Sequence, residues 1–220
     1  MLLPKCRDAH RGPGRPRQFD LAEREAIILD TAERIILERG LAATSMAAIA
    51  KEAGMSKRTL YEVFESRATL FASIVRRIRT RKMRPLADEQ HGLPLAQRLR
   101  LLLTPSQEKF SDPLPMAILR AVIAESERQP DLAQQFLQEG PYALYAMIRT
   151  ELDRSVARGE IAIADTEEAA RLLVDMAHTN LLEHLVLVTG SCQEDVDMLR
   201  KRVDLAIRVF HHGIAERAVA

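Results

Sequence analysis

Apolar residues in the first third of the chain recur with the spacing of an α-helix. They share one face of a helix expected from about Leu21 to Arg39, and Gly40 follows where a left-handed residue commonly ends a helix. The inward-facing residues are Ile28, Ala32, Ile35 and Ile36, at positions i, i+4, i+7 and i+8. The pattern therefore predicts one amphipathic helix near the N-terminus.

Two shorter helical patterns follow it. The first begins at Thr44 or Ser45 as N-cap and ends at Gly54, and Ser56 can cap the second. Their inward positions are Met46, Ile49, Ala50 and Ala53 in the first and Leu60, Val63 and Phe64 in the second. Two short helices joined across a glycine predict a helix-turn-helix.

Helical spacing continues through the rest of the chain, so the expected fold class is all-α. A fourth helix begins near Arg67, becomes strongly basic and ends before Pro85. Proline and glycine then separate helices expected at residues 94–111, 114–128, 130–138, 141–158, 166–189 and 193–217. The predicted organisation is a flexible basic arm (1–18), a helix-turn-helix domain (19–66), a connecting helix (67–84) and a C-terminal domain (85–220).

Charge is divided unevenly along the 220 residues. Residues 1–84 carry 18 Lys and Arg against 10 Asp and Glu, whereas residues 85–220 carry 14 against 21, so the basic end is the one expected to face a polyanion. Cys6 and Cys192 make neither a disulfide framework nor a zinc-ligand spacing. No apolar run approaches the roughly 18 residues of a membrane span. We expect a cytoplasmic protein without a membrane partner.

The outward positions of the third helix carry the candidate chemistry. They are Lys57, Arg58, Thr59, Tyr61 and Glu62. In the major groove of DNA, arginine binds guanine bidentately, and lysine, threonine and tyrosine reach phosphates or base edges. Ser56 lies at the helix N-terminus, which itself favours an anion. The alternative is an ordinary solvated helix face, and the pattern alone leaves it open.

A basic arm precedes the first helix. Gly12, Pro13, Gly14 and Pro16 exclude a helix there, so Arg15 and Arg17 project from extended chain. Arginines on such an arm suit the minor groove of DNA. A flexible basic terminus without a fixed role is the alternative.

Residues 15–70 resemble the DNA-binding domain of the TetR family of bacterial transcriptional regulators. The resemblance rests on Gly40-x-x-x-Thr44-Ser45-Met46-x-x-Ile49-Ala50-x-x-Ala53-Gly54-Met55-Ser56-x-x-Thr59-Leu60-Tyr61-x-x-Phe64-x-Ser66-Arg67-x-x-Leu70. It implies an all-helical homodimer with an N-terminal three-helix DNA-binding domain and a C-terminal ligand-binding and dimerisation domain. The implied partners are a double-stranded DNA operator, a second copy of the chain and a small effector.

The resemblance also implies roles for individual residues. Thr44, Tyr61 and Arg67 would hold phosphates, while the side chains nearest the bases would be Ser56, Lys57, Arg58 and Thr59. The chain departs from the family pattern at Ala68, where many members are acidic. Glu62 lies on the same helix as the base-contacting residues, where it either repels phosphate or accepts from a cytosine amino group.

Part of the C-terminal domain also has a resemblance. Residues 120–132 and Gly140-Pro141 are similar to one domain type found among regulators of efflux and related stress genes.

The last helix has a regular apolar seam. The last helix carries apolar residues at alternating spacings of three and four, which is typical of helix pairing. They are Val196, Leu199, Val203, Ala206 and Phe210. We expect this seam, together with the apolar end of the preceding helix at residues 181–188, to form a four-helix interface with a second copy, and burial within one chain is the alternative.

Candidate effector contacts are apolar or aromatic residues of the middle helices. They are Phe110, Met116, Leu119, Ile123, Tyr142, Tyr145 and Met176, with His178 as a polar group. Such walls suit a small apolar or aromatic organic molecule, although the same residues could be ordinary core.

An all-helical metal enzyme is the competing class. Asp175 and His178 have a spacing that can bind metal, but the second such pair that a bundle metal site needs is missing. Phosphate-binding glycine loops, G-x-S-x-G and H-E-x-x-H are also absent from the sequence. We therefore expect neither enzyme activity nor a cofactor. The preferred function is a ligand-responsive regulator, a repressor released from a palindromic operator by its effector, with a constitutive DNA-binding regulator as a further alternative.

Overall fold

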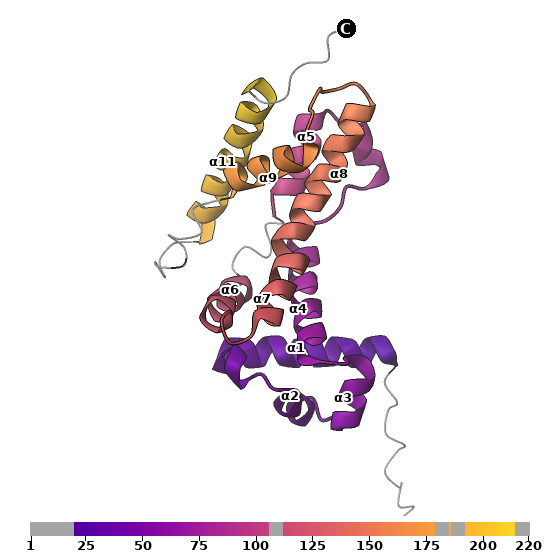
Figure 1. Ribbon diagram of the computed structural model, residues 1–220, viewed down its shortest axis with the longest axis vertical. Helices are drawn as coiled ribbons and strands as arrows, with labels where there is room; N and C mark the ends of the chain where they lie inside the picture. Colours follow the sequence, from indigo (N-terminus) through magenta and orange to yellow (C-terminus); the bar gives the residue numbers. More distant parts are fainter. Residues whose placement is uncertain (1–19, 106–111, 179–184, 186–191, 214–220) are drawn as a thin grey trace, which may run out of the picture.

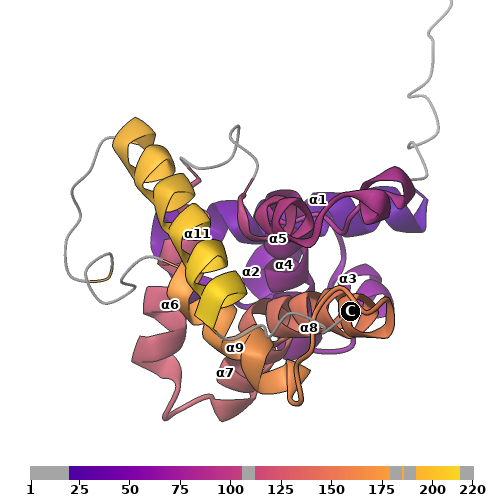
Figure 2. The ribbon, with the colours of Figure 1, turned by 90° about the horizontal axis from the view of Figure 1, so that it is seen from above.

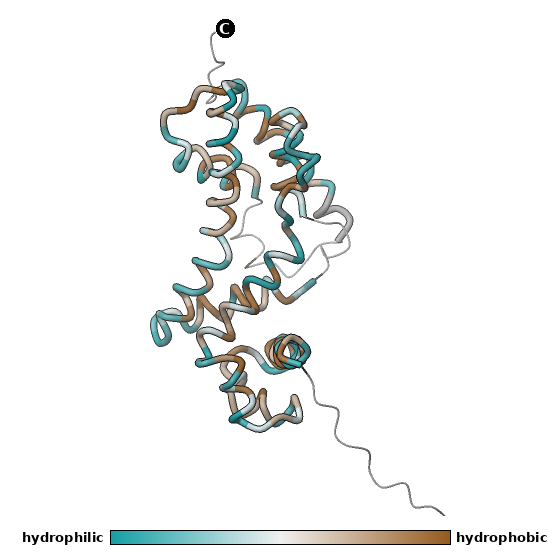
Figure 3. Tube along the Cα trace, turned by 90° about the vertical axis from the view of Figure 1, so that its right-hand side faces the viewer, coloured by the Kyte–Doolittle hydropathy of each residue, from teal (hydrophilic) through white to brown (hydrophobic). Residues whose placement is uncertain are grey.

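The computed structural model describes residues 20–105, 112–178, 185 and 192–213, with the side chains of 192–196 outside that description. Every regular element assigned in these residues is helical, which confirms the all-α prediction. The molecule is elongated, with α1, α2 and α3 at one end and α5, α9 and α11 towards the other (Figure 1). Polar and apolar stretches alternate along the helices, as expected of amphipathic helices packed on a shared interior (Figure 3).

The N-terminal helices begin at the polar caps that the sequence offers. They are α1 (Leu21–Arg39), η1 (Leu41–Ala43), α2 (Met46–Glu52), α3 (Lys57–Val63) and α4 (Arg67–Lys82). Asp20 and Glu23 form a reciprocal capping box at α1, and serine hydroxyls accept from backbone N–H groups at the next three α-helices. These bonds satisfy amides that a helix N-terminus leaves without partners.

Gly54 makes the turn between α2 and α3. Its φ is +65°, a conformation that costs glycine little because it has no Cβ. The Met55 amide bonds back to the carbonyl of Ala50 at 2.9 Å, which closes the C-terminal end of α2. The helix-turn-helix therefore lies where the spacing predicted it.

The C-terminal domain is built from six α-helices and two shorter helical segments in the described residues. They are η2 (Asp88–Gly92), α5 (Leu95–Leu103), α6 (Leu114–Glu125), α7 (Pro130–Leu137), η4 (Gln138–Tyr142), α8 (Ala143–Ala157), α9 (Thr166–Ala177) and α11 (Cys192–Gly213).

Helix boundaries differ from the sequence prediction in several places. The helix predicted over 94–111 ends at Leu103, where Thr104 adopts an extended backbone ahead of Pro105. The predicted break at Gly140-Pro141 is absent, because α7 passes into α8 through the π-helical turn η4, whose wider hydrogen-bond pattern accommodates a proline lacking an N–H. The helix predicted over 166–189 instead ends at Ala177. There the amide of His178 and its Nδ1 both contact the carbonyl of Val174, and His178 adopts an extended backbone.

The buried apolar side chains form two clusters. The first joins α1 to α4 with residues of α6 and α7, among them Ile118, Val122 and Leu132. The second joins α5, α8, α9 and α11. Helices α6 and α7 are therefore packed directly on the N-terminal helices α1 and α4, although they lie beyond Pro85, at which the sequence predicted a domain boundary.

The seam on α11 faces inward. Leu199, Val203, Ala206 and Phe210 are each at most 8% exposed and belong to the second core cluster. The prediction that they form the dimer interface is wrong for this reason: α11 packs them against α9 and α5 of its own chain. The side chain of Val196 lies outside the described residues. Figure 2 shows α11 along one side of the molecule, so its other faces remain at the surface.

Candidate DNA-binding surface and effector cavity

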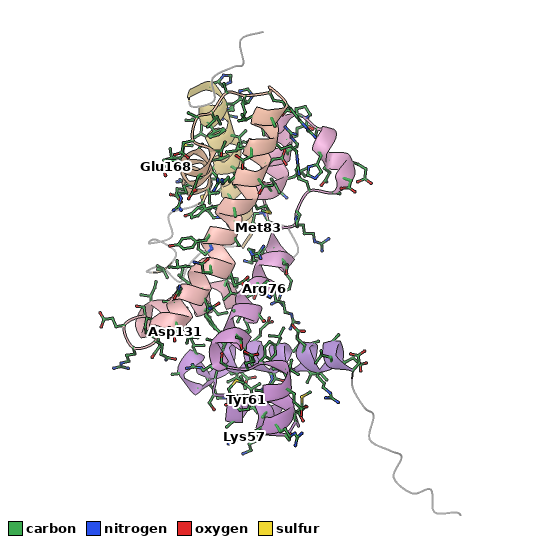
Figure 4. The ribbon with its side chains drawn as sticks, turned by 45° about the vertical axis from the view of Figure 1, so that its right-hand side comes forward. Lys57, Tyr61, Arg76, Met83, Asp131 and Glu168 are labelled. Atoms are coloured by element: carbon green, nitrogen blue, oxygen red, sulfur yellow. The ribbon has the colours of Figure 1, made fainter. Side chains whose placement is uncertain are left out.

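Helix α3 presents its polar face to solvent. Leu60 is fully buried, whereas the side chain of Arg58 is 89% exposed and Tyr61 is 50% exposed. Lys57 is also exposed, and Figure 4 shows Lys57 and Tyr61 at the end of the molecule formed by the helix-turn-helix. A cation and an aromatic hydroxyl projecting from one short helix match the donors that enter a DNA groove.

Glu62 has an immediate partner within α3. Its carboxylate accepts a hydrogen bond from Nε of Arg58 at 3.1 Å, one helical turn away. Such an exposed i, i+4 pair contributes only about 0.3–0.5 kcal/mol, so DNA can displace it readily. Glu62 is therefore a weak, displaceable partner of an Arg58 side chain that stays in solvent.

Ser56 and Thr59 are joined at the start of α3. The Ser56 hydroxyl accepts from the Thr59 amide at 3.0 Å and lies 2.8 Å from the Thr59 hydroxyl. Both side chains are thus fixed as part of the helix cap, at the end where the helix dipole favours an anion. Ser56 is exposed there, and Thr59 is half-buried.

Two residues expected to bind phosphate are instead occupied inside the protein. Thr44 is 3% exposed and its hydroxyl donates to the carbonyl of Gly40. All three nitrogens of the Arg67 guanidinium donate to protein oxygens, and burial lowers the pKa of this group. In the free protein both side chains therefore serve internal contacts, and the expectation that they hold phosphate stays a prediction. Arg15 and Arg17 lie outside the described residues.

A cavity of about 500 Å³ lies between the connecting helix and the C-terminal domain. Its size fits a small organic molecule. Its lining comes from α4, α6, α7, η4, α8 and α9, and Figure 4 locates Met83 of this lining at the far end of α4 from the DNA-binding surface. The lining residues are Val75, Ile78, Arg79, Lys82, Met83, Pro115, Met116, Ile118, Leu119, Phe136, Gly140, Pro141, Leu144, Tyr145, Val174, Asp175 and His178.

A few polar groups interrupt the apolar lining. The Tyr145 hydroxyl donates to a carboxylate oxygen of Asp175 at 3.0 Å. Burial is the main cause that raises the pKa of Tyr145, and the hydrogen bond to this carboxylate is the second cause. Nδ1 of His178 lies 2.8 Å from the carbonyl of Val174, which can only accept, so Nδ1 carries the proton. A neutral His178 then has Nε2 as an acceptor.

The predicted effector contacts divide into two groups. Met116, Leu119, Tyr145 and His178 line the cavity. The other described candidates do not: Ile123 is 54% exposed, Tyr142 is 41% exposed, and Met176 packs against the second core cluster. Phe110 lies outside the described residues. The α4 wall was not predicted from the sequence, because the apolar residues of that helix have the ordinary spacing of a core-facing helix and give no sign that one side faces a cavity.

Ion pairs fix α4 to its neighbours on two sides. Arg77 and Arg81 contact acidic residues of α1, while Arg76 and Arg79 contact Glu139 of η4. The Arg76 guanidinium donates to both carboxylate oxygens of Glu139, which lowers the pKa of that carboxyl. The helix that joins the DNA-binding end to the rest of the molecule is therefore clamped beside the cavity.

Helix α11 has a second apolar face, which is exposed. Met198, Leu205 and Val209 are each about half exposed, at 54%, 52% and 48%. On a helix of 3.6 residues per turn they lie within about 40° of one another and roughly 120° from the buried face. An apolar stripe of this kind on a surface helix is typical of an interface.

The described residues hold no group of three or more His, Cys, Asp and Glu placed to bind a metal ion. Asp175 and His178 instead contact Tyr145 and a backbone carbonyl. Within the same residues, every helix is too short or too polar to cross a membrane.

Two family models match the chain. The model of bacterial regulatory proteins of the tetR family matches residues 28–74, and that of the AefR-like transcriptional repressor C-terminal domain matches residues 97–212. The chain belongs to the TetR family. TetR regulators bind DNA operators and act as dimers, so this member is a DNA-binding transcriptional regulator and not an enzyme. The model over 28–74 ends within α4, and the second begins within α5.

Individual TetR relatives agree with this assignment. The chain is 25% identical over 153 residues to the HTH-type transcriptional regulator UidR of Escherichia coli K12, covering 69% of this chain and 76% of UidR. Among solved structures, the flavonoid-responsive regulator FrrA has 28% identity and a TM-score of 0.68, covering 90% of this chain and all of that one. Salmonella enterica GusR has 25% identity and a TM-score of 0.57, with 85% of this chain and 94% of GusR covered.

Proposed function

We propose that the protein is a repressor whose dimer binds a palindromic operator and releases it when a small organic effector fills the cavity. The observation that carries this proposal is the position of the cavity: one of its walls is α4, the same helix that begins at the helix-turn-helix. A ligand that favours one position of α4 over another necessarily favours one position of the DNA-binding surface.

The lining favours an aromatic or otherwise apolar effector that carries a hydroxyl group. The walls are mainly aliphatic carbon, with Met116, Leu119 and Phe136 as adaptable contacts. Asp175 offers carboxylate oxygens to a ligand hydroxyl, and Nε2 of a neutral His178 is a second acceptor. The similarity to FrrA, described as flavonoid-responsive, supports the same ligand class.

The dimer interface is proposed on the exposed face of α11. Met198, Leu205 and Val209 supply an apolar stripe that a second copy would cover. The buried seam on another face of the same helix anchors α11 to the core of each protomer.

DNA contacts are proposed for the exposed residues of α3. Lys57, Arg58 and Tyr61 project from its solvent face, with Ser56 and Thr59 at its N-terminus. We propose that Arg58 leaves Glu62 on binding and contacts a base, and that Tyr61 contacts the DNA backbone.

The test measures operator release and cavity occupation together. An operator is first selected from a random duplex pool with the purified full chain, and the flavonoid naringenin serves as the probe ligand. Naringenin should weaken operator binding, and the operator should weaken naringenin binding by the same factor, because the coupling between two sites is reciprocal.

Matched variants on α6 locate the effect. Leu119→Trp fills the cavity and should abolish the response, while Ile123→Trp, on the same helix but exposed, should retain it. Equal responses from both variants would contradict the cavity as the effector site. A chain that binds its operator but no ligand from a broader set of hydroxylated aromatics would be a constitutive regulator instead.

A further inference from the structure

Arg67 is at the centre of an unusual set of contacts at the start of α4. Its Nε donates to the carbonyl of Thr44 at 3.0 Å and its Nη2 to the carbonyl of Leu41 at 2.7 Å. Its Nη1 donates to the side-chain oxygen of Gln129 at 2.5 Å. One guanidinium therefore joins α4 to the turn at residues 41–44 and to the start of α7, which are far apart in the sequence.

Two of these contacts fix the entry to the helix-turn-helix. Leu41 and Thr44 bracket η1, and Ser45, which caps α2, follows directly. The Leu41 carbonyl also accepts from the Thr44 amide at 3.0 Å within this turn, so the charged guanidinium of Arg67 adds a second, stronger bond to a turn that is already closed. The position of α2 relative to α4 thus depends on this side chain.

The third contact reaches the C-terminal domain. Gln129 is the N-cap of α7, and its side-chain nitrogen donates to Glu125 at the end of α6 at 3.0 Å. The amide thus accepts from Arg67 and donates to Glu125, so it is held from both sides. Glu125 also favours the charged form of Arg67, although burial outweighs it and lowers the pKa.

Helix α7 connects this contact to the cavity. Gln129 lies at its beginning, whereas Phe136 near its end and Gly140 in η4 line the cavity. Between them, Leu132 is buried in the core shared with the DNA-binding helices. A short helix fixed at both ends moves as a unit, so displacement of the cavity wall shifts Gln129.

We propose that Arg67 is a positioning residue that couples α7 to the helix-turn-helix through Gln129, and that it is not a phosphate ligand. Arg67 contacts both the turn before α2 and the N-cap of α7, so the position of that turn depends on the position of α7. The inference rests on the proposed function only in its last step, that α7 responds to occupation of the cavity.

Salt dependence of operator binding separates this role from a phosphate contact. Losing a phosphate contact lowers the slope of log affinity against log salt by about one, whereas losing a positioning residue weakens binding without changing the slope. Arg67→Gln should therefore lower operator affinity, about tenfold or more, at an unchanged slope. Lys57→Gln, which removes one charge from the exposed face of α3, should lower the slope by about one.

A second variant tests the coupling without any effector. Operator binding to the wild-type full chain should alter amide hydrogen exchange in residues 136–142, and Gln129→Ala should abolish that change while keeping the contacts of Arg67 to Leu41 and Thr44. Gln134→Ala, an exposed position on α7, is the matched control and should behave as wild type.

The outcomes are distinct. An equal fall in slope for Arg67→Gln and Lys57→Gln would overturn the positioning role, and so would an exchange response that persists in Gln129→Ala or is missing in the wild type. Both measurements use only the protein and its operator, without an effector. A protein that passes both tests but releases its operator for no effector would therefore contradict only the proposed function.

Discussion

At the scale of single residues, the same side-chain type serves opposite purposes in this protein. Arg58 is exposed on α3 and has only a displaceable partner in Glu62. Arg98 is fully buried, where its guanidinium contacts Glu151, Ser155 and Glu160. An exposed guanidinium is available for DNA, whereas a buried one is committed to the fold.

Substitution of Arg58 should affect recognition rather than folding. We expect Arg58→Ala to weaken operator binding by about 1–3 kcal/mol and to relax the preference at one base position, because a bidentate base contact is lost. Titrations against operators varied one base at a time measure both effects. An unchanged preference profile would exclude Arg58 as a base contact.

Substitution of Arg98 should affect folding instead. Arg98→Leu leaves Glu151, 3% exposed, with one ion-pair partner fewer in the interior, and we expect a loss of about 3 kcal/mol in the free energy of unfolding. Arg100→Leu, on the same helix, removes an exposed pair with Asp204 and should cost less than about 1 kcal/mol. Urea unfolding of both variants gives the comparison, and similar losses would contradict the argument from burial.

At the scale of elements, α4 is the helix that joins the helix-turn-helix to the cavity. It begins at Arg67, carries the pairs to Glu139 in its middle and ends in the cavity wall. Figure 4 shows Arg76 between the DNA-binding end and Met83, so the clamp on Glu139 lies midway along the path from cavity to operator. The attachment of α4 to η4 depends on the ion pair between Arg76 and Glu139, which weakens when acid protonates the carboxylate.

The Glu139 clamp predicts a pH-dependent contribution to stability. Arg76 lowers the pKa of Glu139 below its ordinary value of 4.5 in the folded protein. The stabilisation is therefore complete above pH 4.5 and is lost as the pH falls through the lowered pKa. The difference in melting temperature between wild type and Glu139→Gln should shrink as the pH drops from about 6 to about 3. Arg76→Gln should reproduce the same trend, and a constant difference across this range would argue against the clamp.

At the scale of the whole molecule, function requires two DNA-binding ends held at a fixed separation. A two-fold dimer places its helix-turn-helix motifs in successive major grooves, so half-sites should lie about 34 Å, or one helical turn, apart. The exposed stripe on α11 lies far from α3 in the elongated protomer (Figure 1). If this stripe is the dimer interface, as proposed, small changes of angle there are amplified at the DNA.

Disruption of the α11 stripe should separate the protomers. Leu205→Glu places a charge on the exposed apolar face, and we expect light scattering to show a halved mass and operator affinity to fall because one DNA-binding end binds weakly alone. Arg208→Gln makes the same change in net charge at an exposed position of α11 outside the stripe and should remain dimeric. A dimeric Leu205→Glu protein would place the interface on another surface.

Local interactions explain what the sequence by itself determined. Helix caps, glycine turns and the spacing of apolar residues act within a few positions, and they predicted α1 to α4, the turn at Gly54 and the exposed face of α3. These features suffice for the all-α fold and the helix-turn-helix. They depend on neighbours along the chain, which the sequence lists in order.

Only the tertiary structure decided contacts between distant segments. Helix α11 has two apolar faces, and packing against α5 and α9 selected the one carrying Val203 for the interior. Arginine is a side chain that commonly binds phosphate, but Arg67 donates instead to Gln129, which lies 62 positions away in the sequence. The cavity likewise needs six elements to enclose it. A hydrophobic or charged side chain has no preferred partner in the sequence, because burial and pairing are satisfied by whichever surface the fold brings near.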